Sequence, residues 1–505
     1  MRNFDFDNLF ILDLANNHQG DVKHALNIIS SIGKVVRDHE IRATIKFQFR
    51  QLDTFIHPAS RESSDNKHIP RFISTRLEKS DYATLAKAVK DEGMITMATP
   101  FDEESLDVIG DLGIEVIKVA SCSASDTPLL EQISTQGKPV VASTAGLTIT
   151  QIDNLVNLFD LRGVEYAVMH CVAIYPTPLE KLKLNQIELL RFRYPGIPIG
   201  FSTHEDPDNY LPVRIAVAKG AKLFERHVGM NTDKYKLNAY SSDADQVNNW
   251  IIAYKEAREI CGGENRSPAT PEEISSLKTL QRGVFAKSNI KKGAAINRQQ
   301  VYFAMPWKEG SLSSGKWHDG MVADKDYAKD EALSETLAKL DPSHSQIIHG
   351  IVLQIKGLLN NARIVVGPES SVEISHHYGL DRFREFGAVI IDCVNREYCK
   401  KLLVMLPRQK HPYHYHKRKE ETFQLLFGDM EIEADGHVTR MKPGDTFLVK
   451  PGTWHKFHTL DGAIVEEVST THYKNDSFYE DEQIARLNLE ERKTRIPSLG
   501  RVVGV

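Results

Sequence analysis

The chain has few cysteines and no long apolar run. Its five cysteines among 505 residues are odd in number and lack Cys-x-x-Cys spacing, which argues for reduced thiols in a cytoplasmic protein. No segment approaches the roughly 20 apolar residues that a membrane span needs. The N-terminal residues Met1–Asp7 are acidic and lack an apolar core, so we expect no signal peptide.

An excess of basic residues is also missing. The net charge is −5, which gives a nucleic acid or an anionic membrane no electrostatic support as a partner. With 41% hydrophobic and 26% charged residues, the composition is that of an ordinary globular protein. A chain of 505 residues is too long for one core, so we expect two to four domains.

Residues 8–260 alternate short apolar runs with amphipathic stretches. The candidate strands are Leu9–Ala15, Ala43–Phe49, Ile95–Thr99, Val116–Ala120, Pro139–Ser143, Tyr166–Cys171, Ile197–Ser202 and Leu223–Glu225. Eight strand–helix units over about 250 residues predict an α/β fold of the TIM (β/α)8 barrel type. A doubly wound open sheet is the alternative, which the lack of a Gly-rich dinucleotide loop disfavours.

Polar residues stand at the ends of these predicted strands. They are Asn17, His18, Lys46, Gln48, Thr99, Lys118, Ser121, Ser143, Thr144, His170, Ser202, His204, Glu225 and His227. In a barrel, the carboxyl ends of all strands meet at one mouth, so this set predicts an active site there. For a single Ser or Thr, the alternative is a helix N-cap.

Several segments resemble the sialic acid synthase (N-acetylneuraminate synthase) family over roughly residues 8–340. They are Asp13–Gly20, Ile45–Gln48, Ala98–Asp102, His170–Pro178, Ile199–His204 and Glu225–His227, followed by Leu280–Ala286 and Asn289–Gly293. The last two match the small antifreeze-protein-like (SAF) domain of that family. We therefore predict a synthase barrel at 1–265, a turn-rich linker, and an SAF domain at 275–340.

The resemblance implies condensation of phosphoenolpyruvate with an open-chain aldose, such as an acetamido hexose. The products would be phosphate and a sialic-acid-like 2-keto-3-deoxy sugar acid. Matching catalytic positions are Asp13, Lys46, Gln48, Lys118, His204 and His227, and matching substrate-binding positions are Asn17, Ser121, Ser143, Ser202 and Tyr175. His204 and His227 would bind a weakly held Mn²⁺ or Mg²⁺ ion that polarises the aldehyde. The family also implies a homodimer.

The chain departs from the family pattern at three places. Asp13 replaces a Glu, Ser123 replaces the Glu of a Ser-Gly-Glu stretch, and Met305 replaces an Arg associated with the acetamido group. We expect condensation with a different acceptor aldose, and Asp126 is a candidate for the missing carboxylate. The alternative is a non-catalytic sugar-binding or sensor protein on a degenerate synthase scaffold.

A second cluster of chemistry lies near the C-terminus. His414, His416 and Glu421, with Gly428 following, and then Gly444, Pro451, Gly452 and His455, resemble the two-part cupin signature. His414 and His416 alternate, so on a strand both side chains point to one face. Three imidazoles and a carboxylate suit Zn, Mn, Fe or Ni. Thr459 stands where the family's second motif often has Asn. The alternative is a set of surface histidines in a basic loop.

We therefore predict an all-β cupin (jelly-roll) domain at 345–505. It should begin after a helical stretch at Gln346–Leu359, with short strands such as Ala388–Val394 and Leu402–Leu406, and finish in a charged, helical tail at Asp476–Lys493. The domain could act as a sugar isomerase, as a sugar-binding module, or hold a purely structural metal.

Overall fold

The computed structural model describes residues 4–61, 66–263, 266–338, 344–367, 370–473 and 475–497, together with Leu499. The chain divides into two compact units, Met1–Pro268 and Ala269–Val505, which are described separately. None of the helices in the described ranges is long and apolar enough to cross a lipid bilayer.

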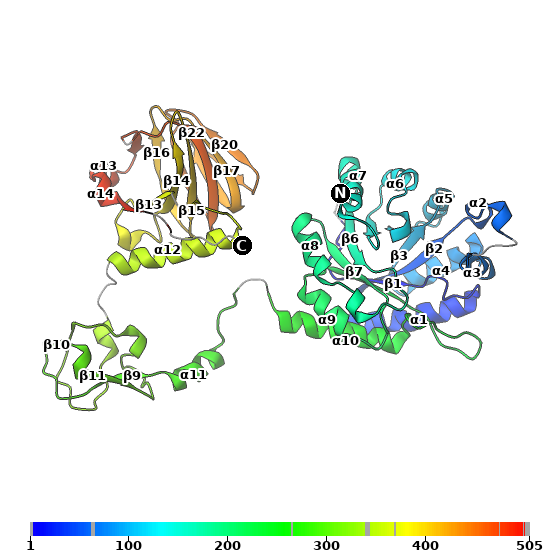
Figure 1. Ribbon diagram of the computed structural model, residues 1–505, viewed down its shortest axis with the longest axis horizontal. Helices are drawn as coiled ribbons and strands as arrows, with labels where there is room; N and C mark the ends of the chain where they lie inside the picture. Colours follow the sequence, from blue (N-terminus) through cyan, green and yellow to red (C-terminus); the bar gives the residue numbers. More distant parts are fainter. Residues whose placement is uncertain are drawn as a thin grey trace. The chain divides into compact units, whose positions relative to one another are not determined.

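The first unit is a closed barrel of eight parallel strands in the order β1 to β8, surrounded by helices (Figure 1). Its strands are β1 Leu9–Asp13, β2 Arg42–Phe49, β3 Ile95–Pro100, β4 Val116–Val119, β5 Val140–Ser143, β6 Tyr166–Cys171, β7 Ile199–Thr203 and β8 Leu223–His227. Its helices are α1 Val22–His39, α2 Leu52–Phe55, α3 Ile69–Ser74, α4 Lys79–Asp91, α5 Glu104–Asp111, α6 Thr127–Ser134, α7 Ile149–Arg162, α8 Asn185–Arg193, α9 Leu211–Ala218 and α10 Ala244–Cys261. The predicted barrel is confirmed, and every strand lies within two residues of its expected bounds.

Helix α10 illustrates how the outer ring is attached. Asp243 caps its first turn by accepting a hydrogen bond from the backbone N–H of Gln246, which satisfies a donor that a helix start leaves free. Its buried face carries Trp250, whose ring meets Phe10 of β1 edge to face at 5.5 Å. Truncation of a buried Trp to Ala typically costs about 3–5 kcal/mol, so this contact is a major anchor of the helix.

The inside of the barrel is layered because successive side chains of a strand point to opposite faces. An apolar floor includes Ile11, Val116, Val141 and Leu223, all fully buried. Two residues further along the same strands stand polar side chains: Asp13, Lys118, Ser143 and Glu225. The apolar floor closes the barrel below, and the polar layer lies at the carboxyl ends of the strands.

The second unit begins with a small region that has its own core. It contains helix α11 Pro271–Leu280, the antiparallel pair β9 Gly283–Ala286 and β11 Val301–Ala304, and the pair β10 Ala295–Ile296 and β12 Met321–Val322. A separate cluster of buried residues includes Val284, Ile290 and Leu333. An independent small core agrees with the expected position, while the SAF assignment stays a prediction. The predicted boundary near residues 341–345, between the SAF domain and the cupin, lies partly outside the described residues.

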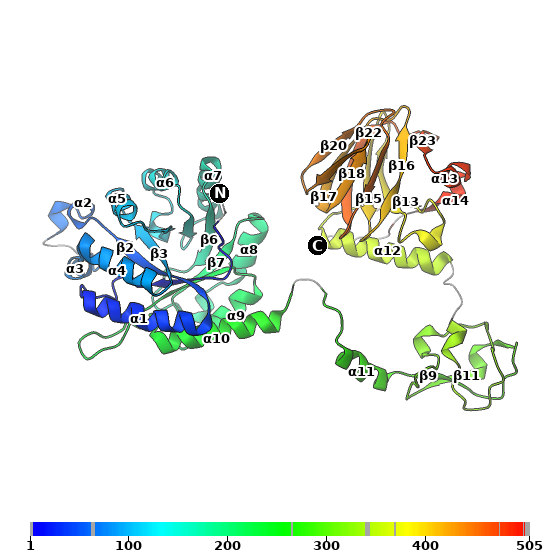
Figure 2. The same cartoon turned by 180° about the vertical axis from the view of Figure 1, so that it is seen from behind.

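The rest of this unit is a two-layered β domain packed on helix α12 His344–Asn361 (Figures 1 and 2). One sheet has the order β20-β17-β22-β15-β14-β13-β24 and the other β19-β18-β21-β16-β23. The strands are β13 Ser371–Ser375, β14 Ala388–Asn395, β15 Tyr398–Met405, β16 Lys410–His416, β17 Glu421–Gly428, β18 Met430–Ala434, β19 His437–Met441, β20 Thr446–Val449, β21 His455–His458, β22 Ala463–Thr470, β23 Ser477–Tyr479 and β24 Lys493–Ile496. The predicted all-β cupin and its leading helix are confirmed.

The prediction of a helical tail at Asp476–Lys493 is wrong in part. Strand β23 pairs with β16, and β24, which starts at Lys493, pairs with β13, so both complete the sheets. Only the short helices α13 Glu482–Arg486 and α14 Leu489–Arg492 match the expectation. The high charge of this segment suggested an exposed helix, but pairing at the sheet edges satisfies its backbone instead.

Candidate active site and candidate metal centre

Two lysines and two carboxylates form the centre of the barrel mouth. The Lys46 ammonium lies 2.9 Å from Asp13 Oδ2 and also contacts Glu225. The Lys118 ammonium lies 3.3 Å from Glu225 Oε2 and donates a hydrogen bond to Ser143 Oγ. All five residues are buried. Glu225 therefore bridges the two lysines.

The charges of this cluster are set by its members. Burial lowers the pKa of Lys46, but Asp13 and Glu225 outweigh it and hold that pKa above its ordinary value. For Glu225, burial raises the pKa, but Lys118 and Lys46 prevail and bring it down to about 2. Burial lowers the pKa of Lys118 below its ordinary value, with Glu225 opposing the shift. Lys46 and Glu225 are thus charged at neutral pH.

His204 and His227 stand beside this cluster, with ring centroids 5.2 Å apart. The Nδ1–H of His204 donates to the backbone oxygen of Val172 at 3.0 Å, which leaves Nε2 with a free lone pair. Burial, helped by His227, lowers the pKa of His204 to about 3, and burial also lowers the pKa of His227. His227 Nε2 lies 3.5 Å from Asp13 Oδ2. Two neutral imidazoles near a carboxylate suit a divalent cation.

Two tyrosines flank the histidines. Tyr175 packs on His204 at 4.3 Å between ring centroids and on Tyr240 at 5.2 Å, and Tyr240 lies 5.4 Å from His227. The Tyr175 side chain is half exposed, so it lines the open side of the mouth. Tyr240 was not predicted, because it follows β8 in an irregular segment without a strand pattern.

Gln48 and Asn17 differ in what their amides contact. Gln48 donates to Asp13 Oδ2 at 3.4 Å and accepts from Arg50 at 3.0 Å, which places it within the polar layer. Asn17 donates to the backbone oxygen of Val228 at 2.8 Å and to Ser241 at 3.0 Å. Its amide oxygen accepts from Asn238 at 3.2 Å. Both ends of the Asn17 amide therefore hold the segment after β8.

The remaining predicted serines stand around the lysines. Ser121 Oγ accepts from the backbone N–H of Ala145 at 3.0 Å, which leaves its own hydrogen free to donate. Ser202 is buried and lies opposite Glu225 in the β7–β8 register. Ser123 is buried as well, and Met305 is exposed in the second unit.

The hypothesis that Asp126 supplies the missing carboxylate is not supported. Asp126 is exposed and its Oδ1 accepts from the backbone N–H of Leu129 at 3.4 Å, so it caps helix α6. The carboxylate that contacts both lysines is Glu225. It lies two residues before His227 on β8, and strand alternation alone would place both on the inner face.

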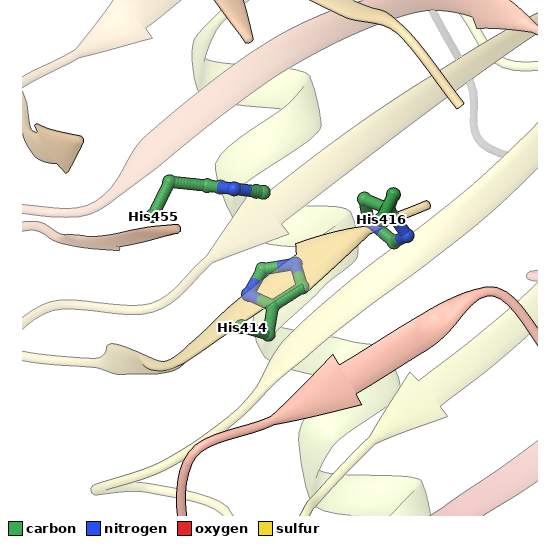
Figure 3. Close-up of side chains that lie close together, drawn as sticks. All are labelled: His414, His416 and His455. Atoms are coloured by element: carbon green, nitrogen blue, oxygen red, sulfur yellow. The ribbon is translucent and has the colours of Figure 1, made fainter. Parts of the chain in front are cut away.

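A second constellation lies between the two sheets of the cupin. His414 and His416 project from β16, and His455 comes from the neighbouring strand β21 (Figure 3). Their ligand nitrogens lie within 4.8 Å of one another, the one such group among the described residues. All three side chains are buried, so the alternative of surface histidines is wrong.

Backbone carbonyls orient all three imidazoles. The Nδ1–H groups of His414, His416 and His455 donate to the backbone oxygens of Pro412, Asp476 and Thr453 at 3.0, 2.7 and 3.1 Å. A carbonyl oxygen can only accept, so Nε2 of each ring keeps its lone pair. Burial lowers the pKa of each of these histidines, which favours the neutral, metal-binding form.

Glu421 reaches the same point from the opposite sheet. Its Oε2 lies 3.5 Å from His416 Nε2 and 3.4 Å from His455 Nε2. Among the described residues, neither Glu421 Oε2 nor His455 Nε2 has a hydrogen-bond partner. The other carboxylate oxygen is held by Lys419 at 2.6 Å. Unpartnered buried atoms that face each other fit a metal ion with three nitrogen ligands and one oxygen ligand.

Thr459 has no part in this centre. Its hydroxyl donates to Asp429 Oδ1 at 3.0 Å and accepts from the backbone N–H of Gly462 at 2.9 Å. The residue that replaces the family's Asn therefore shapes a turn.

Comparisons with known proteins match both the barrel and the cupin. The NeuB family matches residues 40–266, and a cupin domain matches residues 401–468. A solved spore coat polysaccharide biosynthesis protein E of Chromobacterium violaceum is 42% identical with a TM-score of 0.63, covering 66% of this chain and 99% of that one.

Two curated relatives are named as synthases. The N,N'-diacetyllegionaminic acid synthase of Campylobacter jejuni is 22% identical over 341 residues, or 65% of this chain and 99% of that protein. The N-acetylneuraminate-9-phosphate synthase of Drosophila melanogaster is 31% identical over 230 residues, which cover 44% of this chain and 60% of that protein. The chain thus contains a NeuB family domain at residues 40–266 and a cupin domain at residues 401–468, and its relatives include sialic acid and legionaminic acid synthases.

Proposed function

We propose that the barrel joins phosphoenolpyruvate to the aldehyde of an open-chain aldose, releasing phosphate and a 2-keto-3-deoxy sugar acid. The observation that carries the proposal is the buried layer in which Glu225 bridges Lys46 and Lys118 beside two neutral histidines. Relatives named as legionaminic and sialic acid synthases support the same reaction class.

The lysine side of the layer suits a compact anion. Phosphoenolpyruvate carries a carboxylate and a phosphate, which need fixed cations and hydroxyl donors. Lys118 bonds Ser143, Ser121 follows the end of β4 that carries Lys118, and Ser202 of β7 lies opposite Glu225 of β8. Because Asp13 and Glu225 hold the lysines in position beforehand, little reorganisation is needed when the anion enters.

The histidine side suits the aldehyde. A Mn²⁺ or Mg²⁺ ion bound by His204 and His227 would act as a Lewis acid on the carbonyl oxygen. Asp13 and Gln48, joined at 3.4 Å, present a carboxylate and an amide that can orient sugar hydroxyls. Tyr175 adds a half-exposed wall for the sugar.

Phosphate release from phosphoenolpyruvate, measured with a panel of aldoses and Mn²⁺, tests this proposal. His227→Ala should abolish release, because it removes one of two cation ligands. His39→Ala is the matched control, since His39 bonds Asn248 on the outer helices. If a folded, metal-supplemented protein releases no phosphate with any hexose, pentose or acetamido sugar, the proposed synthase activity is refuted.

A non-catalytic sugar-binding or sensor protein is the second candidate. The absence of a carboxylate at Ser123, with Asp126 used as a helix cap, favours it. It predicts thermal stabilisation by an aldose without any turnover.

For the cupin we propose a transition-metal centre of His414, His416, Glu421 and His455 that acts on or binds a sugar. These residues would hold a Zn, Mn, Fe or Ni ion, which would supply Lewis-acid chemistry for aldose–ketose exchange. The centre would then supply the barrel with substrate or bind a product. His416→Ala should spare condensation of a directly supplied aldose. Loss of condensation in this variant would mean that the two activities are coupled.

We further propose that the chain forms a homodimer in the cytoplasm. Light scattering coupled to size exclusion would give twice the 57.0 kDa mass of one chain. A single-chain mass at micromolar concentration would contradict the dimer.

A further inference from the structure

Arg50 continues the line of polar side chains along β2 towards solvent. Lys46, Gln48 and Arg50 are spaced by two residues, so they share the inner face of the strand and its extension. Hydrogen bonds connect them through Asp13, because Arg50 donates to Gln48 at 3.0 Å and Gln48 donates to Asp13 at 3.4 Å. Arg50 is thus the outermost member of the chain that starts at Lys46.

The guanidinium is fixed by two aromatic rings. Its central carbon lies 4.1 Å from the ring centroid of Phe72 and 3.6 Å from that of Phe101. Such contacts stabilise a cation at a site poor in water. They also hold the side chain in one position, which is what a specificity-determining residue needs.

The charge of Arg50 has no direct ion-pair partner among the described residues, and Asp13 and Asp102 act on it only from beyond contact distance. No described carboxylate forms an ion pair with it, its Nε is buried without a hydrogen-bond partner, and burial lowers its pKa to about 10. Asp102, the acidic residue nearest in sequence after β3, is occupied by the backbone N–H groups of Gln51 and Ser105. A partly buried guanidinium whose Nε–H has no partner is stabilised by an anion that reaches it.

A cavity of about 360 Å³ opens beside Arg50. Apolar side chains such as Phe55, Ile56 and Phe72 form much of its wall, and His57 and His68 add ring nitrogens. None of its described lining residues is acidic. Its electrostatic character is therefore that of a site for an anionic group.

We propose that the acceptor aldose carries a carboxylate or phosphate group that Arg50 binds. This inference rests on the proposed condensation and adds the class of its second substrate. Phosphoenolpyruvate is assigned to the buried cluster of Lys46, Lys118, Ser143 and Ser202, whereas Arg50 lies four residues beyond Lys46, outside Gln48. The anion at Arg50 therefore belongs to the other substrate, and the fork of the guanidinium matches either oxyanion.

Phosphate-release kinetics with three aldoses of one configuration test the proposal: D-mannose, D-mannuronate and D-mannose 6-phosphate, repeated in the gluco series. Comparison of D-mannuronate with D-mannose 6-phosphate shows whether the anionic group is a carboxylate or a phosphate. At least one charged aldose should have a KM about tenfold or more below that of its neutral parent, the scale of one hydrogen bond between charged groups.

Arg50→Met should raise the KM for the charged aldose by about 10- to 100-fold and leave the KM for phosphoenolpyruvate within about twofold. Arg50→Lys keeps the charge but loses the planar fork of donors. Its KM for the charged aldose should therefore lie between those of the wild type and Arg50→Met. Arg42→Met is the matched control, because Arg42 begins the same strand at the opposite end and pairs with Asp5 on the surface.

Equal KM values for charged and neutral aldoses, or a rise in the KM for phosphoenolpyruvate in Arg50→Met, would overturn the inference. If no aldose supports release, the proposed condensation fails, and binding still decides the inference. A charged aldose should then raise the melting temperature of the wild-type protein but not of Arg50→Met. Equal stabilisation of both proteins, or of neither, would refute it.

Discussion

Substitution of Glu225 by glutamine tests the claim that this carboxylate holds the two barrel lysines in place. The side chain keeps its size, but the negative charge between Lys46 and Lys118 is removed. Asp13 still pairs with Lys46, at 2.9 Å, while Lys118 is left with no described carboxylate as an ion-pair partner.

The expected loss of stability follows from the shift in the pKa of the Glu225 carboxyl. Its pKa falls from 4.5 to about 2 on folding. At about 1.4 kcal/mol per pH unit, this corresponds to about 3 kcal/mol of stability at neutral pH. The same size is expected when one partner of a buried ion pair is removed, about 3–5 kcal/mol.

The sign of the pH dependence is also fixed. A carboxyl with a lowered folded-state pKa stabilises the fold above its unfolded pKa, here 4.5. That stability is lost as the pH falls from about 4.5 towards about 2. The difference between wild type and Glu225→Gln should therefore be largest at pH 7 and shrink below pH 4.

Hydrogen exchange in a urea series, read by mass spectrometry on peptides of the barrel strands, isolates this unit from the rest of the chain. Glu256→Gln is the control, because Glu256 pairs with Arg214 on the surface and should cost less than about 1 kcal/mol. Equal, small effects of the two substitutions would refute the bridging role of Glu225. So would a difference that does not change between pH 7 and pH 3.

Three further predictions concern the other named residues. His416→Ala should lower the metal content per chain measured by mass spectrometry. His458, on the neighbouring strand β21, is partly exposed, so His458→Ala should leave the metal content unchanged. Equal metal contents in the two variants would contradict the metal centre. Lys118→Met should slow phosphate release by about 100-fold or more without changing cupin metal content, because it removes a buried cation from the substrate site; an unchanged rate would exclude Lys118 from it. Gly428→Ala should destabilise the cupin by about 1–3 kcal/mol in calorimetry, since the added Cβ would collide with the backbone oxygen of Gly462. Gly350→Ala in helix α12, where the space is open, should instead stabilise by about 0.5–1 kcal/mol; the reverse order would contradict the packing.

The barrel was predictable from its sequence because its strands are buried on both faces. Such strands appear as continuous apolar runs, and the run at Tyr166–Cys171 gives the observed bounds of β6 without change. The histidine cluster of the cupin was predictable for a similar reason. His414 and His416 alternate on one strand, and strand geometry then fixes their common face.

Features that depend on distant residues escaped prediction. The bridging role of Glu225 needs lysines from β2 and β4, which lie more than 100 positions earlier in the chain. Strand β24 was missed because its pairing with β13 joins segments far apart in sequence. Asp126 was a plausible carboxylate until its position at the start of α6 showed that it caps the helix. Local patterns carry no information on such partners.

The proposed reaction of the barrel is the condensation of phosphoenolpyruvate with an aldose. Mass spectrometry of the products, with phosphoenolpyruvate, Mn²⁺ and charged and neutral aldoses, tests it most directly. The expected product is a new acid whose mass equals phosphoenolpyruvate plus aldose plus water minus phosphoric acid, and it should be absent with His227→Ala. Stabilisation by an aldose with no such product, from the folded and metal-loaded protein, would contradict it.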